Sequence, residues 1–112
     1  MKRIVYADRT LLTDGRLALT VLDYARALAV SEAADTVTLP TVDDDGAVQQ
    51  AAMLLGPASQ IIVIDTDLPD RDDLGAEPVI ADIEVRLHRL QPGPVAYEPE
   101  APAAADPIDD LG

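Results

Sequence analysis

The sequence predicts an α+β fold in which the elements follow the order β-α-β-β-β-α, with two helices on one face of a mixed four-stranded sheet. Two segments, near residues 14–30 and 78–90, repeat apolar residues at helical spacing. Short runs of β-branched residues lie around them and are typical of strands. An Asp45-Gly46 pair separates two such runs and predicts a hairpin.

Composition divides the chain into two parts. Residues 91–112 hold five acidic residues, no basic residue and five of the nine prolines. Such a segment buries too little apolar surface to offset the entropy cost of ordering it. We therefore expect a Pro/Ala-rich, acidic, disordered tail at 91–112. Residues 1–90 hold both helical repeats, and we expect them to form a single α+β domain.

The first two predicted elements are a strand and a helix. Residues 3–7 form a β-branched and aromatic run, which predicts a strand. Thr13 or Asp14 is a suitable helix N-cap, and a carboxylate there also suits the positive end of the helix dipole. Apolar residues at helical spacing then predict an amphipathic helix over 14–30: Leu17, Val21, Tyr24 and Leu28.

Two further segments follow this helix. Residues 37–42 alternate and predict a strand that runs parallel to residues 3–7, because a helix connects the two. Pro40 cannot donate a ladder hydrogen bond, so we expect this strand to be at a sheet edge or bulged. By residue type, residues 47–55 fit a strand and a helix about equally well. A helix there would give the alternative fold, a three-layer α/β arrangement.

The last two predicted elements are a strand and a helix. Residues 61–64 are four consecutive aliphatic residues, which predict a central strand. An acidic loop follows over 67–75, and Pro78 suits the first turn of a helix. Apolar residues at helical spacing extend that helix to about residue 90: Ile80, Ile83, Leu87 and Leu90.

Two short segments resemble a known group of sequences. They are Leu54-Leu55-Gly56-Pro57-Ala58-Ser59-Gln60, which follows a hairpin, and the helix start Leu12-Thr13-Asp14. Together they resemble a group of small uncharacterised proteins from high-GC Gram-positive bacteria, and the resemblance covers residues 1–90. It implies a strand rather than a helix for residues 47–55. It implies no activity.

One pattern is compatible with metal chemistry. Asp65 and Asp67 follow the aliphatic run as Asp-x-Asp, and two carboxylates at this spacing can share a Mg²⁺ ion. The pattern resembles the acidic strand end of metal-dependent nuclease and primase folds. Asp8 is a third candidate ligand if its strand is a neighbour, although those folds usually carry Glu there. The competing interpretation is that the aspartates are ordinary polar residues of a loop.

Other candidate sites have less support in the sequence. The acidic run over 65–73 does not match a Ca²⁺-binding loop in either register, because Gly and Glu are not at the required positions. His88 is the only histidine and lies near a helix end, where we expect it to be partly exposed. We expect Ser59 to bond to backbone in a turn, because it does not occupy a nucleophile elbow.

Charge and composition narrow the class of partner. The net charge is −13, with only eight scattered Lys and Arg residues, which disfavours nucleic acid and anionic membranes. The chain has no Cys, which excludes disulfides and thiolate metal sites. The start of the chain lacks the apolar stretch of a signal peptide, so we expect a cytoplasmic protein.

The sequence therefore predicts a small non-enzymatic interaction or accessory protein with no cofactor and no catalytic residue. A domain of about 90 residues without large aromatics has a modest core. Its two helices cover one face of the sheet, so we expect the second face to bury apolar side chains against another protein or a second copy. The alternative function is a divalent-metal-dependent phosphotransfer or nuclease-like domain that uses Asp65 and Asp67, with Asp8 as a further ligand.

Overall fold

The computed structural model describes residues 1–90, and the predicted tail at 91–112 lies outside them. The order of the elements is β-β-α-β-β-β-α with one short 3-10 helix. The α+β class is confirmed, and the five-stranded sheet has one strand more than predicted. All of its strand pairs are antiparallel, so the predicted mixed sheet with a parallel crossover is wrong.

The additional strand belongs to a hairpin at the start of the chain. Strand β1 (Lys2–Tyr6) pairs with β2 (Arg9–Thr13) across a two-residue turn that begins at Ala7. Ala7 adopts a φ of 54°, a left-handed conformation that alanine rarely takes. The two residues of the turn are Ala7 and Asp8, so the turn lacks the Asn-Gly or Asp-Gly sequence that signals a hairpin. Strand β2 lies between β1 and β3, so β1 and β3 run in the same direction but do not pair with each other.

The first helix begins and ends as predicted. Helix α1 spans Gly15–Val30, and the Asp14 side chain caps it by accepting a hydrogen bond of 3.0 Å from the backbone N–H of Leu17. The apolar residues on one side of α1 face the sheet and helix α2 (Ala76–Leu90), and they are buried: Leu17, Ala18, Val21, Tyr24, Ala25 and Leu28.

The central hairpin confirms that residues 47–55 form a strand. Strand β3 (Asp35–Val42) pairs along its whole length with β4 (Val48–Leu55). Gly46 closes the turn with a φ of 84°, a conformation that glycine adopts without a steric penalty. Strand β3 is an interior strand, so the prediction that Pro40 marks an edge is wrong. Pro40 is tolerated because β3 pairs with β2 at a single position, Val42 with Leu12.

The last strand is at the opposite edge of the sheet. Strand β5 (Ile61–Asp65) pairs with β1, and the strand order is β4-β3-β2-β1-β5. The predicted central position of residues 61–64 is therefore wrong, because β5 has a neighbour on one side only. The 3-10 helix η1 (Asp72–Leu74) then leads through Gly75, whose φ is 66°, into α2.

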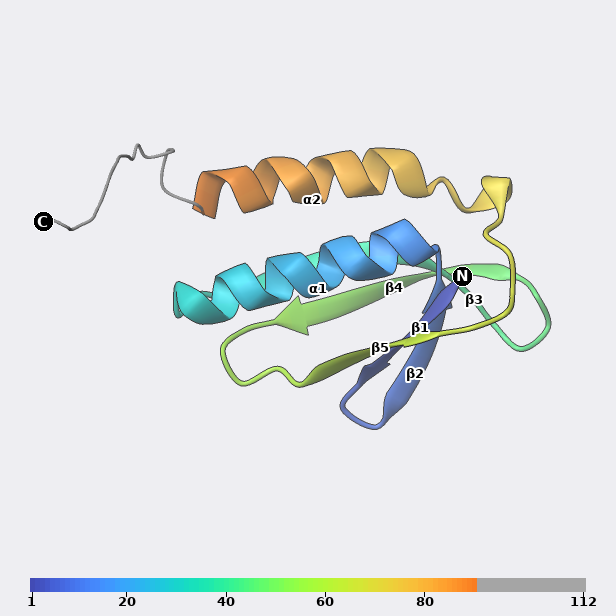
Figure 1. Cartoon of the computed structure of the whole chain (residues 1–112), viewed down its shortest axis with the longest axis horizontal. Coiled ribbons are helices and arrows are strands. Elements are labelled where there is room, and N and C mark those ends of the chain that lie inside the picture. Colours follow the sequence, from blue (N-terminus) through green and yellow to red (C-terminus); the bar gives the residue numbers. More distant parts are fainter. Residues whose placement is uncertain (91–112) are drawn as a thin grey trace, which may run out of the picture.

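The domain has two layers, with both helices on one side of the sheet (Figure 1). Helix α1 contacts β1 and β5, and α2 contacts β3. The core lies between the layers, and its largest fully buried side chains include Ile4, Leu17, Leu28, Leu39, Leu55 and Ile83. Neither helix has the length and apolarity that crossing a membrane requires.

Candidate interaction surface

The face of the sheet that points away from the helices carries a row of paired residues that crosses all five strands. Ile64 on β5 pairs with Arg3 on β1, and Arg3 pairs with Leu12 on β2. Leu12 pairs with Val42 on β3, and Val42 pairs with Val48 on β4. Every member of this row is aliphatic except Arg3, so the row is an apolar stripe with one positive charge.

A second row lies beside the first on the same face. Ile62 on β5 pairs with Val5 on β1, which pairs with Thr10 on β2. The exposed fractions of Ile62 and Ile64 are 59% and 45%. We call the two rows together the outer face: Arg3, Val5, Thr10, Leu12, Val42, Val48, Ile62 and Ile64. None of its members is acidic, although residues 1–90 hold sixteen of the 21 acidic residues.

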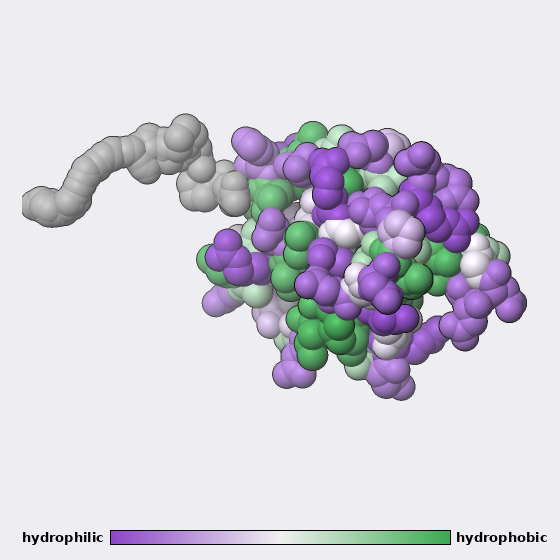
Figure 2. Space-filling model, turned by 45° about the vertical axis from the view of Figure 1, so that its right-hand side comes forward, coloured by the Kyte–Doolittle hydropathy of each residue, from purple (hydrophilic) through white to green (hydrophobic). Residues whose placement is uncertain are grey.

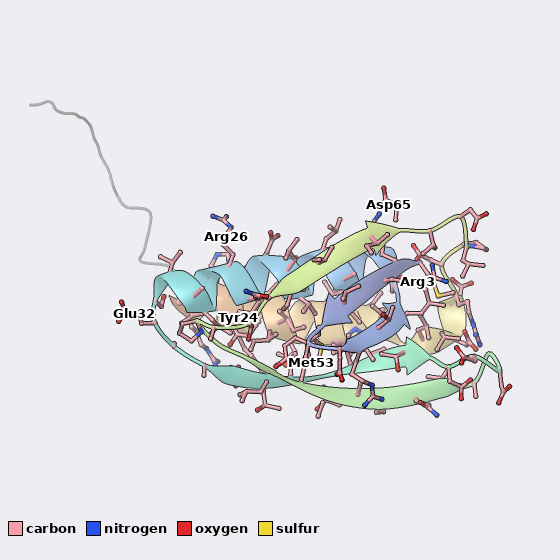
Figure 3. All side chains as sticks on the ribbon, turned by 90° about the horizontal axis from the view of Figure 1, so that it is seen from below. Arg3, Tyr24, Arg26, Glu32, Met53 and Asp65 are labelled. Carbon is pink, nitrogen blue, oxygen red and sulfur yellow. The ribbon has the colours of Figure 1, made fainter. Side chains whose placement is uncertain are left out.

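The outer face lies on the side of the molecule that Figure 3 views. Figure 3 views the molecule from below, so that the sheet lies in front of the helices and Arg3 points out near one end of β1. Figure 2 shows hydrophobic surface in its lower part, on the side where Figure 1 places the strands. An uncovered apolar area on an acidic protein is typical of an interaction surface.

The outer face is hollowed where β2 meets β3. A cavity of about 580 Å³ is open there, and Leu12 and Val42 supply apolar lining. Arg3 lines it with a positive charge, and Asp43 and Asp44 from the β3–β4 turn line it with negative charges. The hollow therefore offers both apolar and charged contacts to a side chain of a partner.

A second cavity of about 500 Å³ lies at the other end of β1, between Tyr6 and the β4–β5 loop. The Tyr6 hydroxyl donates a hydrogen bond to the backbone oxygen of Leu54. Ser59 Oγ accepts a hydrogen bond of 2.9 Å from the backbone N–H of Gly56, which confirms that Ser59 bonds to backbone in a turn. This serine stabilises the loop and has no general base beside it in the cavity lining.

The structure does not bring the candidate metal ligands together. Strands β1 and β5 are neighbours but antiparallel, so Asp8 lies beyond the end of β1 that is opposite to Asp65. Asp65 accepts a hydrogen bond of 2.5 Å from Lys2 Nζ, and this bond lowers the pKa of the Asp65 carboxyl. Within residues 1–90, no three carboxylate or histidine side chains gather closely enough to hold a metal ion.

The acidic loop between β5 and α2 is tied to the rest of the domain. Asp70 Oδ1 lies 2.9 Å from the amino group of Met1 and accepts a hydrogen bond of 2.9 Å from the backbone N–H of Gly15. These contacts, led by the amino group, lower the pKa of the Asp70 carboxyl. Within the loop, Asp73 forms an ion pair with Arg71 at 2.6 Å, and Arg71 Nη1 donates a hydrogen bond of 2.8 Å to the backbone oxygen of Gly46. Asp70 and Arg71 therefore connect the loop to the rest of the domain.

We expect divalent metals to leave the stability of this protein almost unchanged. A ligand that binds only the folded state raises the melting temperature once its concentration exceeds its Kd. Titration with Mg²⁺, Mn²⁺ or Ca²⁺ to low millimolar concentration should shift the melting temperature by less than about 1 °C. A large, saturable shift that Asp65→Asn and Asp67→Asn abolish would contradict this expectation.

A polar cluster that sequence reasoning missed joins α1, β3 and α2. Tyr24 is 3% exposed, and its hydroxyl donates a hydrogen bond of 2.5 Å to Asp35 Oδ2. Arg86 Nη1 donates to the same oxygen at 3.0 Å, and Arg86 Nη2 pairs with Asp82 at 3.0 Å. Only the Asp82–Arg86 pair, with its i,i+4 spacing, was visible in the sequence.

The pKa values in this cluster are shifted in opposite directions. Burial, together with the neighbouring Asp35, raises the pKa of Tyr24 to about 12. The hydrogen bond from Tyr24 is the main cause that lowers the pKa of the Asp35 carboxyl. The charges of Asp35 and Arg86 are paired with each other, so the cluster connects secondary structure elements and does not offer a free acid or base.

The lone histidine has the position that the sequence predicts. His88 is exposed in the last turn of α2 and lines a shallow surface hollow with Glu84, Val85 and Arg89. A single imidazole on an exposed helix surface lacks the additional ligands that a metal or a catalytic role requires.

Comparison with protein-family models, curated proteins and solved structures finds no match for this chain. The resemblance to small proteins of high-GC Gram-positive bacteria therefore stays a prediction.

Proposed function

We propose that this chain is a small non-enzymatic interaction protein that associates with a second copy of itself through the outer face of its sheet. The observation that carries the proposal is the apolar stripe from Ile64 to Val48, which crosses five strands and has no covering layer among residues 1–90. Two such stripes can pack against each other across a two-fold axis, the commonest symmetry of oligomers. The proposal includes the cytoplasmic location expected from the sequence.

The distribution of charge supports a second copy as the occupant. With a net charge of −13, two copies repel each other over most of their surfaces. The strand residues of the outer face include no carboxylate, so two copies that meet there do not bring acidic residues of their stripes together; Asp43 and Asp44 lie in the β3–β4 turn, at the rim of the hollow. The single cation, Arg3, has no ion-pair partner among residues 1–90.

The size of the outer face indicates a weak contact. Five strands spaced about 4.8 Å apart and about five residues long give a flat area of about 400 Å² per copy. A stable interface buries about 800 Å² per partner. We therefore expect association at high micromolar concentration, and we expect it to strengthen with salt, which screens the repulsion between copies.

Sedimentation equilibrium at low and moderate salt tests this proposal. The wild type should exceed the mass of 11.9 kDa at high micromolar concentration, and more so at moderate salt. Ile62→Lys places a charge on the outer face and should weaken the face contact roughly tenfold or more.

The matched control for Ile62→Lys is Val85→Lys. Val85 is 50% exposed, but it lies on α2, on the other side of the molecule. Val85→Lys changes the net charge by the same amount and should associate like the wild type. A wild type that stays at 11.9 kDa under both salt conditions would rule the proposal out, as would equal effects of the two lysine variants.

The alternative function, metal-dependent phosphotransfer at Asp65 and Asp67, has no supporting observation in residues 1–90. It would need a third ligand near this pair, and Asp8 lies beyond the opposite end of β1.

A further inference from the structure

The two edges of the sheet differ in how well they are protected. Edge strands in soluble proteins usually carry charged residues, proline or a bulge, or they are very short, because their free N–H and C=O groups invite pairing with another strand. Strand β5 is five residues long and ends at Asp65, which forms an ion pair with Lys2. Strand β4 is eight residues long, and residues 46–64 around it contain no charged side chain.

The hydrogen-bond pattern of the β3–β4 hairpin shows which groups of β4 point outward. The backbone N–H of Asp43 donates to the backbone oxygen of Ala47 at 2.9 Å, so these two residues form a hydrogen-bonded pair. Bonded and non-bonded pairs alternate along an antiparallel ladder. The odd-numbered residues of β4 therefore bond to β3, and the even-numbered ones direct their N–H and C=O groups away from it.

Independent contacts agree with this alternation. Pro40, which has no N–H, occupies a non-bonded pair with Gln50. The outward backbone oxygen of Leu54 accepts the hydrogen bond from the Tyr6 hydroxyl. Three residues of β4 remain whose outward groups have no partner among residues 1–90: Val48, Gln50 and Ala52.

We propose that this open edge pairs with the same edge of a second copy, antiparallel and centred on Gln50. In this register Gln50 faces Gln50 of the second copy, and Val48 faces Ala52. The three outward residues of each copy then supply about six hydrogen bonds between the copies. The contact joins two five-stranded sheets into one continuous sheet, with all helices on the same side.

Electrostatics favours the antiparallel register over a parallel one. The turn before β4 carries three consecutive acids, Asp43, Asp44 and Asp45. Antiparallel pairing about Gln50 places this turn beside residues 55–57 of the second copy, which are uncharged. Parallel pairing would place six carboxylates side by side, which is unfavourable in a protein with a net charge of −13. Because residues 46–64 carry no charged side chain, two copies of this edge can meet without opposing like charges, and a second copy is the occupant that this edge fits.

This edge contact is distinct from the contact through the outer face. It rests on the proposed function only in that both describe a chain that associates with itself. The face contact depends on Ile62, which lies on β5 at the far edge of the sheet. The edge contact depends on the backbone of β4, so substitutions separate the two.

A charge exchange at the centre of the register tests the edge contact in the full-length chain. Gln50→Lys and Gln50→Glu each place like charges opposite each other, and each should weaken the edge contact roughly tenfold or more. An equimolar mixture of the two variants should regain association, because lysine then faces glutamate. Sedimentation equilibrium measures all three samples, in the wild-type background and with Ile62→Lys.

Two controls make the test specific. Thr38→Lys and Thr38→Glu place the same charges on the same side of the sheet one strand further in, where mixing should restore nothing. Gln50→Pro removes one outward N–H without removing a bond to β3, so it should weaken association while circular dichroism still shows the folded state. Failure of the Gln50 mixture to associate better than either variant alone would overturn the proposal.

Amide hydrogen exchange gives an independent readout. On raising the concentration of the wild type, the amides of Val48, Gln50 and Ala52 should gain protection. Those of Gln49 and Ala51 already donate to β3 and should be protected throughout. A wild type that stays monomeric would overturn both contacts. Association that responds to Gln50 but not to Ile62 would support the edge and reject the face, and the reverse result would reject the edge.

Discussion

Leu39→Ala should lower the free energy of unfolding by about 3 kcal/mol. Leu39 is fully buried at the centre of β3, where its side chain belongs to the core between the sheet and the two helices. Truncation to alanine removes apolar contacts and leaves a cavity that a small aliphatic core refills poorly. A domain of about 90 residues has only about 5–13 kcal/mol of stability in total, so the variant loses a large share of it.

The matched control is Leu54→Ala on the neighbouring strand. Leu54 is 59% exposed, so its truncation should cost less than about 1 kcal/mol. Urea denaturation at pH 7 measures both variants, and the midpoint should shift while the slope stays constant. Equal losses for the two leucines would contradict the assignment of Leu39 to the core.

Asp35→Ala should cost about 2 kcal/mol, the second large effect. The reason is the Tyr24 hydroxyl, which is buried and would lose its acceptor, while Arg86 would lose one of its two carboxylate partners. The charge pair itself contributes less, because the side chains of Asp35 and Arg86 are about one-third exposed and screened by water.

A double-mutant cycle isolates this hydrogen bond. In a Tyr24→Phe background the hydroxyl is absent, so Asp35→Ala should cost clearly less than it does in the wild type. Thermal unfolding of the four proteins of the cycle gives the coupling between the two residues. A cost that is the same in both backgrounds would show that the hydrogen bond does not contribute to stability.

The same cluster predicts how stability depends on pH. The pKa of Asp35 is lower in the folded state than its usual value of 3.8. Its contribution is therefore present above that value and is lost as the pH falls through the folded pKa. The pKa of Tyr24 is raised from 10.0 to about 12. Its contribution is present below pH 10 and is lost between pH 10 and about 12, at up to about 1.4 kcal/mol per pH unit.

Melting temperatures measured across both pH ranges check these signs. Tyr24→Phe should remove the alkaline loss, because phenylalanine does not titrate. It should also weaken the acid dependence, because the hydrogen bond from Tyr24 is the main cause of the low pKa of Asp35. An alkaline loss that persists unchanged in Tyr24→Phe would contradict this assignment.

Local sequence determined the elements whose signals are contained in a few neighbouring residues. The N-cap at Asp14 and the helical spacing of Leu17, Val21 and Leu28 predicted α1. The Asp45-Gly46 pair predicted the turn of the central hairpin, where Gly46 takes a positive φ. These features depend on backbone preferences and on hydrophobic periodicity, which act between residues that are close together in the sequence.

Residues 47–55 show that local sequence signals do not always determine the secondary structure. Their residue types fit helix and strand about equally well, and pairing with β3 along the whole strand decides the outcome. Strand β2 was missed for a related reason. Its turn begins at Ala7, which is uncommon at a positive φ, and only pairing with β1 and β3 stabilises the strand. Contacts distant in sequence override weak local preferences.

The sequence by itself determined both helices, the acidic charge and the turn of the central hairpin, and it predicted the α+β class with an α/β alternative. Only the tertiary structure decided the strand order, and with it the exposed edge at β4, the apolar stripe of the outer face and the separation of Asp8 from Asp65. The Tyr24–Asp35–Arg86 cluster also appears only in three dimensions. The physical reason is that strand order and side-chain clusters depend on which distant segments bury each other's apolar surface, and no single segment encodes that choice.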